Sequence, residues 1–266
     1  MIATRWHKPP MAIWQACLGI LLLMGWQLGA TTGLLDKFFF SRPSDVLERV
    51  LQMFVSGTIW PHLATTLLEA ALAFLIGVGA GVLFGFLLAR NRFLATLLDP
   101  YIRIANALPR VVLAPIFLLW LGLGIWSKVA LGVTVVFFIV FFNTFRGVRE
   151  VDAVIVDNAR MLGASEPQLI YHVLTPSALT WIFSSLHISV GFSIIAVVVG
   201  EYLGSSRGIG YMIAQAEGAF DTTGVFAGMV ILAAIVLLVG ALVDPLERYL
   251  LRWKVRDAEG VKGDFS

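Results

Sequence analysis

Residues 151–176 read VDAVIVDNARMLGASEPQLIYHVLTP and form a polar insert between two long apolar segments. Apolar residues at positions i, i+3, i+4, i+8 and i+11 of the insert form one stripe along a helix. The stripe consists of Val151, Val154, Ile155, Ala159 and Leu162. A solvated connector is the ordinary interpretation of such a loop, but the rest of the sequence contains no soluble domain that would cover the stripe. We therefore expect a partner protein to bury it.

The insert also predicts where its first helix ends and a second one begins. Gly163 is placed to take the left-handed conformation that ends many helices. Ser165 stands three residues before Gln168, the spacing of a capping box, and Pro167 falls in the first turn, where no amide donor is missed. Pro176 is expected to stop the second helix before the next apolar segment. The predicted order is helix, glycine turn, helix.

The composition indicates that a lipid bilayer surrounds the remaining helices. Of the 266 residues, 59% are hydrophobic and 14% are charged, and the mean hydropathy is +0.88, which is too apolar for a soluble chain of this length. Six windows without Asp, Glu, Lys or Arg are long enough to cross about 30 Å of hydrocarbon as helices. They cover residues 9–32, 70–89, 111–127, 129–145, 177–200 and 222–243. The sequence predicts an all-α polytopic membrane protein with about six transmembrane helices.

The basic residues predict the orientation of these spans. With the N-terminus in the cytoplasm, most of the 19 lysine and arginine residues fall on the cytoplasmic side, as the positive-inside rule requires. Both termini and the 151–176 insert are then cytoplasmic. The first apolar segment lacks a small-x-small cleavage site before Thr31, so we expect a retained anchor rather than a cleaved signal.

Three single residues carry expectations that depend on this arrangement. Cys17, the only cysteine, lies inside the first window and is expected to be a buried packing residue. Glu69 precedes the second window and is expected at the membrane interface. Lys128 separates the third and fourth windows and is expected on the outer side.

Two further segments have recognisable helix patterns. In residues 46–54 the apolar residues recur at helical spacing on one face and the polar residues lie opposite, which predicts an amphipathic helix on the outer surface. Ser44 is expected to cap the start of this helix. In the second window, Gly77, Gly81 and Gly85 fall on one helix face, and small residues at this spacing favour close helix packing in lipid.

The third window is interrupted by prolines. Pro109 and Pro115 break the backbone hydrogen-bond ladder within one segment, and Arg110 adjoins the first of them. Irregular backbone at membrane depth is tolerated where protein buries it or where it lines a cavity. We therefore expect this span to line a pathway.

Several segments resemble the nitrate/sulfonate/taurine-type permeases of ABC importers. They are residues 106–110 (NALPR), 113–117 (LAPIF), 119–124 (LWLGLG), 142–148 (FNTFRGV), 198–204 (VVGEYLG) and 208–213 (GIGYMI). The insert resembles the E-A-A-x-x-x-G-x9-I-x-L-P loop of that family. Asp157-Asn158-Ala159 replaces the E-A-A triplet, and Thr175 replaces the leucine before the proline.

The resemblance implies a type I ABC importer-like permease core at residues 41–250. An N-terminal anchor helix and outer segment at residues 1–40 would precede it, and a cytoplasmic tail at residues 251–266 would follow. The insert would be a cytoplasmic coupling-helix loop that docks on an ATPase. The residues implied in this coupling are Asp157, Asn158, Ala159, Gly163, Ala164, Ser165 and Pro176.

The same resemblance implies the partners and the cargo. Two permease copies, as a homodimer, would pair with two ATP-binding ABC subunits in a bacterial plasma (inner) membrane. A periplasmic or extracellular solute-binding protein would deliver a small organic or inorganic anion, such as a sulfonate, taurine or nitrate. The chain has no G-x-x-x-x-G-K-[ST] phosphate loop, so ATP and Mg would bind to the partner ATPase and no cofactor is expected in this chain.

Ionisable residues at membrane depth are candidates for the translocation pathway. Arg110, His187 and Glu201 are the three that the sequence places there. Each has a structural alternative: Arg110 can cap the carbonyls of the broken helix, His187 can pack between helices, and Glu201 can form a salt bridge at the outer end of its span.

Other function classes find less support in the sequence. The four histidines are scattered over different segments, which argues against a metal site, and no nucleophile has a local base motif. The net charge of +2 follows the membrane orientation and does not indicate nucleic-acid binding. A membrane-embedded enzyme would need clustered polar groups near one interface. A stand-alone channel or ion-coupled carrier, working without an ATPase, is the main alternative.

Overall fold

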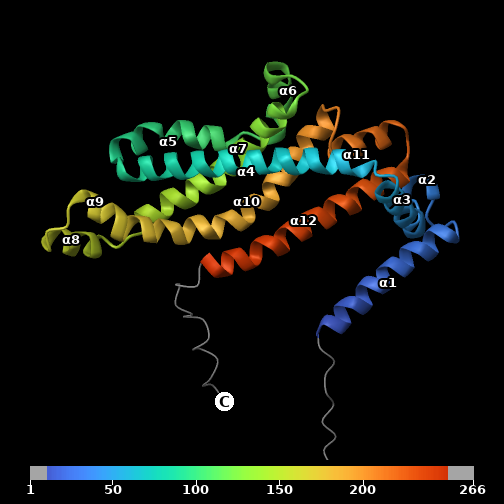
Figure 1. Cartoon of the computed structure of the whole chain (residues 1–266), viewed down its shortest axis with the longest axis horizontal. Helices are drawn as coiled ribbons and strands as arrows, with labels where there is room; N and C mark the ends of the chain where they lie inside the picture. The colour runs from blue at the N-terminus through green and yellow to red at the C-terminus, as the bar shows by residue number, and fades with distance from the viewer. Residues whose placement is uncertain (1–10, 251–266) are drawn as a thin grey trace, which may run out of the picture. The chain divides into compact units, whose positions relative to one another are not determined.

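The apolar runs form helices because lipid offers the backbone no hydrogen-bond partner except itself. The structure is a computed structural model and describes residues 11–250. Figure 1 shows its elements along the chain. They are α1 (Met11–Thr31), α2 (Lys37–Phe40), α3 (Pro43–Val55), α4 (Ile59–Arg90), α5 (Arg92–Ala107), α6 (Arg110–Leu121), α7 (Ile125–Arg149), α8 (Ala153–Met161), α9 (Glu166–Leu169), η1 (Ile170–Leu174), α10 (Thr175–Leu203), α11 (Ile209–Gly218) and α12 (Thr222–Leu250). The predicted all-α class is confirmed, and the predicted tail at 251–266 lies outside the described residues.

Five of the described helices are long and apolar enough to cross a membrane. They are α1, α4, α7, the continuous helix Glu166–Leu203 that includes α10, and α12 up to Val243. The bent pair α5–α6 makes a sixth span if it is counted as one. The prediction of about six spans is therefore confirmed.

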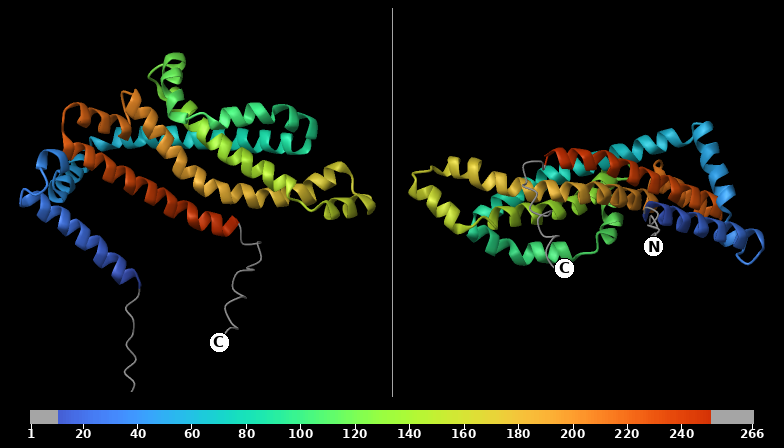
Figure 2. Two further views of the ribbon diagram at one scale, coloured as in Figure 1. Left: turned by 180° about the vertical axis from the view of Figure 1, so that it is seen from behind. Right: turned by 90° about the horizontal axis from the view of Figure 1, so that it is seen from below.

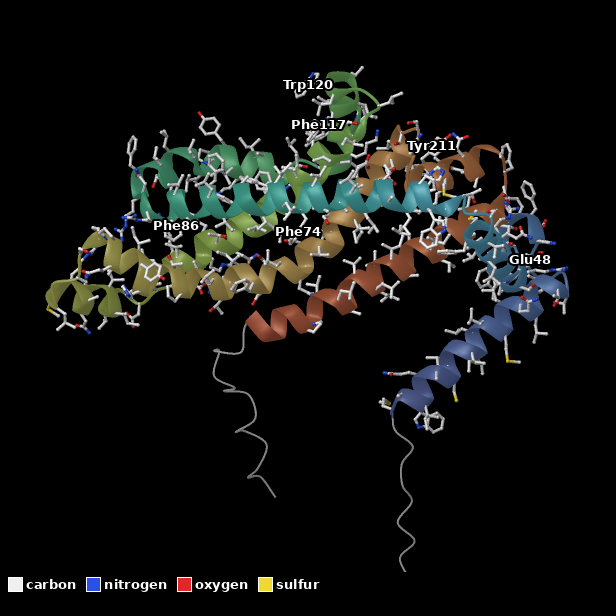
Figure 3. All side chains as sticks on the ribbon, viewed as in Figure 1. Glu48, Phe74, Phe86, Phe117, Trp120 and Tyr211 are labelled. Atoms are coloured by element: carbon white, nitrogen blue, oxygen red, sulfur yellow. The ribbon has the colours of Figure 1, made fainter. Side chains whose placement is uncertain are left out.

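The bounds predicted for the third span, residues 111–127, are wrong. Helix α6 ends at Leu121, and its 12 residues reach only about 18 Å, less than the hydrocarbon thickness. Helix α5 precedes it at an angle of 91°. The break falls at Pro109, because proline disfavours a helical conformation at the preceding Leu108, whose ψ is 129°. Several large apolar side chains of α6 are exposed, among them Leu119 and Trp120, and Figure 3 labels Trp120 near the end of this helix.

The described helices form two compact units. Unit 1 contains the described residues up to Trp60 together with Met212–Ile231, and unit 2 contains Pro61–Tyr211 and the described chain from Leu232. Helices α4, α11 and α12 each contribute to both units. The two units are described separately below.

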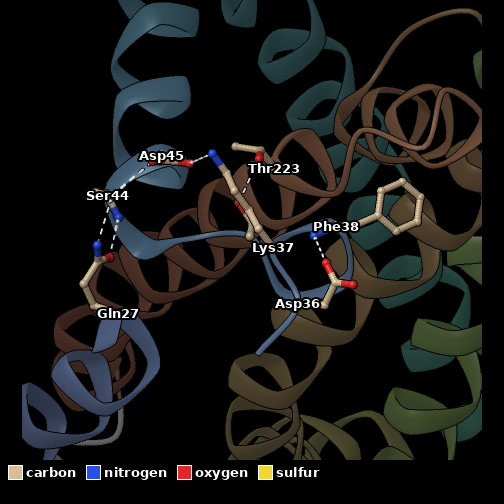
Figure 4. Close-up of polar contacts among 8 residues, drawn as sticks. Gln27, Asp36, Lys37, Phe38, Ser44, Asp45 and Thr223 are labelled. Atoms are coloured by element: carbon tan, nitrogen blue, oxygen red, sulfur yellow. Dashed lines mark hydrogen bonds and ion pairs between the residues drawn. The ribbon is translucent and has the colours of Figure 1, made fainter. Parts of the chain in front are cut away.

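In unit 1, the amphipathic helix predicted at residues 46–54 is present as α3. The predicted cap is wrong: α3 starts after Arg42, with Pro43 in its first turn. Ser44 instead pairs with Gln27, whose Oε1 accepts a bond from the Ser44 amide at 3.1 Å (Figure 4). Because Pro43 supplies the helical φ and lacks an amide donor, a side-chain cap is not required there.

Two ion pairs connect α3 to its neighbours in unit 1. Lys37 Nζ lies 2.8 Å from Asp45 Oδ2 (Figure 4), and this contact lowers the pKa of the Asp45 carboxyl. Arg49 Nη1 lies 2.8 Å from Asp221 Oδ2, which joins α3 to the start of α12. Cys17 is exposed, so its expected packing role is wrong, because α1 buries only Gly29 and Ala30 within the structure.

Unit 2 is built around α7 and α10, which run side by side in both views of Figure 2. The glycine face of α4 packs directly on α7. A Cβ on Gly81 would lie 2.9 Å from the Phe137 carbonyl oxygen, and one on Gly85 would lie 2.8 Å from the Phe141 carbonyl oxygen. Only glycine allows this approach of two backbones, so the predicted packing role of the glycine face is confirmed.

Candidate functional site

The first part of the 151–176 insert folds as predicted, as helix α8 ended by a glycine turn. The Asp152 side chain caps the start of α8 by accepting a bond from the Val154 amide at 2.9 Å. Gly163 has a φ of +85°, in the left-handed region. The following amide, on Ala164, donates to the Ala159 carbonyl at 3.0 Å, a bond that satisfies a free carbonyl at the end of α8.

The second helix of the insert begins with the predicted capping box. The amide of Ser165 donates to Gln168 Oε1 at 2.8 Å, and Pro167 lies in the first turn of α9. We call residues 151–176, with these two helices, the α8–α9 loop. Figure 1 shows this loop beyond the N-terminal end of α10, at the opposite end of that helix from its C-terminus.

The stop predicted at Pro176 is wrong. The chain passes through the π-helical segment η1 into α10, and Pro176 lies in the first turn of α10. The Thr175 amide donates to the Ile170 carbonyl, one residue further back than in an α-helix. This wider turn shifts the hydrogen-bond register just before Pro176, so the missing proline amide does not break the helix.

The apolar stripe of the α8–α9 loop is largely exposed, as predicted. Val154, Ile155 and Leu162 are exposed, and Leu162 exposes 89% of its surface. The neighbouring Met161 exposes 78%. Large apolar groups gathered on a loop that is otherwise polar are typical of a surface that another protein covers.

The structure brings together four of the predicted coupling residues. Ala159, Gly163 and Ala164 line a cavity of about 340 Å³ between α8 and the start of the following helix. Ser165 adjoins it as the cap of α9. Asp157 and Asn158 are exposed on α8, outside this cavity. Pro176 lies beyond η1, apart from these residues.

The charged groups of the α8–α9 loop pair at its surface. Arg160 lies 3.3 Å from Glu166 and 3.8 Å from Asp157, and Arg90 lies 3.1 Å from the other Glu166 oxygen. Most of these side chains are more than half exposed. Exposed pairs of this kind contribute about 0–1 kcal/mol and are screened by salt, so they are readily exchanged for contacts with a partner.

The three membrane-depth candidates do not form one site. Arg110 donates to the carbonyls of Ala105, Asn106 and Leu108 at 3.2, 2.9 and 2.6 Å, which favours its structural alternative as a cap for the break between α5 and α6. His187 lies exposed midway along α10. Glu201 is buried near the C-terminal end of α10, with 1% of its surface exposed.

Glu201 belongs to a group of charges that the sequence did not predict. We call Glu69, Lys128 and Glu201 the buried charge cluster; they expose 1%, 0% and 1% of their surface. The interfacial position expected for Glu69 and the outer position expected for Lys128 stay predictions, and the structure adds that both side chains are buried among the helices. Each residue lies at the edge of an apolar window, and helix packing turns all three edges toward one another. The residue types were visible in the sequence, but the packing that joins them was not.

The chain matches a family model described as "Binding-protein-dependent transport system inner membrane component" over residues 77–256. It is 34% identical to the putative aliphatic sulfonates transport permease protein SsuC of Bacillus subtilis, over 89% of this chain and 86% of that protein. It is 33% identical to the riboflavin transport system permease protein RibX of Chloroflexus aurantiacus, covering 88% of each chain. It is 32% identical to the taurine transport system permease protein TauC of Escherichia coli, covering 89% of this chain and 87% of that one.

The fold is similar to that of a solved transporter chain. A chain from the inward facing MetNI methionine ABC transporter superposes with a TM-score of 0.59 at 21% identity, covering 75% of this chain and 97% of that one. At this identity the likeness concerns the fold alone.

Proposed function

Because the chain belongs to the family of binding-protein-dependent transport system inner membrane components, the permease subunits of ABC importers, we propose that it forms the translocation pathway for a small organic anion and docks on a separate ATPase through the α8–α9 loop. The observation that carries the docking proposal is the exposed apolar stripe of that loop, with Leu162 beside the left-handed Gly163. A stand-alone channel or carrier would have no use for such a surface.

The proposed assembly follows from what the chain lacks and what it exposes. Its 266 residues contain no phosphate loop, so ATP and Mg bind to a partner ABC subunit and this chain is a non-catalytic subunit. A solute-binding protein delivers the cargo on the opposite side of the membrane. Exposed apolar groups on α6, among them Val112, Leu119 and Trp120, suit contact with a second permease copy. The permease core is residues 41–250, and both termini are cytoplasmic.

The charge of one large cavity supports an anionic cargo. A cavity of about 560 Å³ in unit 2 is lined by three phenylalanines and by five charged residues, three arginines (Arg103, Arg146 and Arg149) against Asp99 and Glu150, which leaves one positive charge in excess. Arg103 is neutralised by Asp99 at 2.7 Å, whereas Arg146 and Arg149 face the rings of Trp181 and Phe145. Two of the relatives are named for sulfonates and taurine. A sulfonate carries the fixed negative charge and small organic body that this lining accommodates.

The experiment that tests the proposal is uptake by the reconstituted importer. Proteoliposomes containing this chain and its co-purified ATPase are loaded with ATP and given the solute-binding protein and labelled taurine. We expect uptake that requires ATP, and competition by an alkyl sulfonate at equal concentration. Uptake that continues without ATP would support the stand-alone carrier. ATP-dependent uptake inhibited by riboflavin and not by sulfonates would overturn the anionic cargo.

A further inference from the structure

A second large cavity of unit 2 lies beside the α8–α9 loop. It has a volume of about 610 Å³ and is lined by the C-terminal ends of α4 and α7, by the start of α5 and by residues of the loop. Figure 1 shows the junction of α4 and α5 at the same end of unit 2 as α8 and α9. We call this space the loop cavity, because four separate parts of the chain meet there and one of them is the loop.

The charged side chains that line the loop cavity are mainly basic. They are the four arginines Arg90, Arg92, Arg149 and Arg160 and the two carboxylates Asp157 and Glu166. Four positive charges against two negative ones leave two positive charges in excess. Like charges gathered in one cavity repel one another, and a bound anion relieves this repulsion.

One carboxylate of the chain shows how the arginines hold an anion. Glu166 places one oxygen 3.1 Å from Arg90 Nη2 and its other oxygen 3.3 Å from Arg160 Nη2. Arg90 ends α4 and Arg160 lies on α8, so guanidinium groups from two elements converge on one anionic group. The guanidinium fork binds the oxygens of carboxylates and of phosphates in the same way. The lining of the loop cavity is therefore suited to an oxyanion.

The other two arginines have no carboxylate partner. Arg149 Nε donates to the Ala89 carbonyl at 3.4 Å, and Arg149 Cζ lies 4.6 Å from the centre of the Phe145 ring. Neither Arg92 nor Arg149 forms an ion pair with any residue that the structure describes. Both are exposed, so an anion from outside the chain can reach them. These two side chains account for the excess positive charge.

We propose that the loop cavity binds a phosphate group through Arg92 and Arg149. A phosphate group carries one or two negative charges, which matches the excess. The proposed function places the loop on the cytoplasmic side, where basic pockets between membrane helices bind the headgroups of anionic lipids. Inorganic phosphate has the same chemistry, so the bound group comes from a lipid headgroup or from free phosphate. In either case it ties the ends of α4 and α7 to the loop.

Two measurements on the full chain, purified in a neutral detergent, test this site and its source. Equilibrium dialysis at low salt measures the binding of radiolabelled inorganic phosphate. Native mass spectrometry counts the lipids that the chain retains after extraction from vesicles of phosphatidylglycerol and phosphatidylcholine in equal amounts. Saturable phosphate binding without preferential lipid retention assigns the site to free phosphate. Preferential retention of phosphatidylglycerol assigns it to a lipid headgroup. Binding of neither probe would overturn the proposal.

Arg92→Gln tests whether the bound probe lies in the loop cavity. Arg92 lines this cavity and not the cavity proposed for the cargo. We expect the Kd of the bound probe to rise about tenfold or more, as for a lost charge-assisted hydrogen bond. Arg207→Gln is the matched control, because Arg207 is an exposed arginine of unit 2 beyond the opposite end of α10. The control should leave the Kd unchanged.

Glu166→Gln should act in the opposite direction. It removes the carboxylate that occupies Arg90 and Arg160, so two more guanidinium groups become available to the probe. We expect the Kd to fall about threefold or more. Glu48→Gln makes the same change at an exposed carboxylate of unit 1, labelled in Figure 3, and should have no effect.

The four variants together distinguish a site from general attraction to a basic protein. Equal shifts in the test variants and their controls would overturn the assignment to the loop cavity, as would a Kd that neither Arg92→Gln nor Glu166→Gln alters. If Arg92→Gln does not accumulate, Glu166→Gln decides.

Failure of the proposed function gives a different result. The binding measurements contain no ATPase, so a chain that docks on no ATPase can still bind phosphate or lipid in the loop cavity. An importer with ATP-dependent uptake whose permease binds neither probe contradicts the phosphate site alone.

Discussion

Helix α10 joins two regions whose charged side chains differ in exposure: they are exposed at its N-terminal end and buried at its C-terminal end. At its N-terminal end, Arg160 and Glu166 of the α8–α9 loop pair at 3.3 Å while each exposes more than half of its side chain. At its C-terminal end, Glu201 exposes 1% of its surface and accepts bonds at 2.7 and 2.8 Å from groups of the same unit. At the loop even the large apolar side chain of Leu162 is exposed, whereas at the other end even the charged side chains of the cluster are buried.

The difference shows which region depends on another protein for its contacts. The α8–α9 loop leaves its stripe uncovered and holds its charges in weak surface pairs, so a partner can replace them at little cost. The side chains of the buried charge cluster find their hydrogen-bond partners within unit 2, and these bonds hold the backbone near residues 123–124 and 210 in place. Substitutions should therefore act on assembly at one end and on the fold and the shape of turns at the other.

The largest effect is expected from Lys128→Met, which leaves two buried carboxyl groups without their cation. The change also removes the hydrogen bonds from Lys128 Nζ to the Leu123 and Gly124 carbonyls, and the combined loss should be about 3 kcal/mol or more of unfolding free energy. Unfolding in mixed micelles with increasing denaturing detergent measures this loss. The double variant Lys128→Met/Glu201→Met should recover part of it. A single variant as stable as the unaltered chain would show that the Lys128 charge does not stabilise the buried charge cluster.

A smaller effect is expected where α4 crosses α7, between the two regions. Gly81→Ala forces a methyl group to within 2.9 Å of the Phe137 carbonyl and should cost about 1–3 kcal/mol. Gly79→Ala, two residues earlier, meets no atom within 4 Å and should be neutral or slightly stabilising. The same unfolding experiment compares them. Equal stabilities for the two variants would contradict the close packing of the glycine face.

At the loop, Gly163→Val should strain the turn by roughly 1–2 kcal/mol, because a side chain disfavours the left-handed conformation. Global stability should fall by no more than this strain, since nothing lies within 4 Å of this glycine for a side chain to clash with. We expect ATP-dependent uptake to fall sharply. Gly163→Asn, whose side chain tolerates this conformation, should retain more uptake. Similar uptake in the valine and asparagine variants would mean that the turn does not depend on its φ.

The smallest effect is expected from Arg160→Ala. This change removes the surface pairs with Asp157 and Glu166 and should cost less than about 1 kcal/mol of stability. The loss should shrink further in high salt. A loss of several kcal/mol in the unfolding experiment would show that the loop is held as rigidly as the buried charge cluster.

Local patterns predicted most of the fold and the loop. The uncharged windows identified five spans, and the spacing of Ser165 and Gln168 identified the start of α9. The left-handed Gly163 was also predictable, because helix ends depend on a few neighbouring residues. These features need no knowledge of what packs against them.

Features that depend on packing were missed. Glu69 and Lys128 flank apolar windows, a position typical of the membrane interface, and only the packing of α4, α7 and α10 buries them. Pro176 follows the usual pattern of a helix stop, but the π-helical turn before it absorbs the missing bond. The third span was placed too late because its break at Pro109 divides it into two helices, neither of which crosses the membrane alone.

The docking of the α8–α9 loop on an ATPase is tested most directly by co-purification from native membranes with Leu162→Glu. This substitution places a charge on the stripe without disturbing the fold, because the side chain is 89% exposed. Leu34→Glu, at 85% exposure in unit 1, is the matched control. We predict that the unaltered chain and Leu34→Glu recover an ATP-binding ABC subunit and that Leu162→Glu does not. Equal recovery of that subunit by all three chains would contradict docking through the loop.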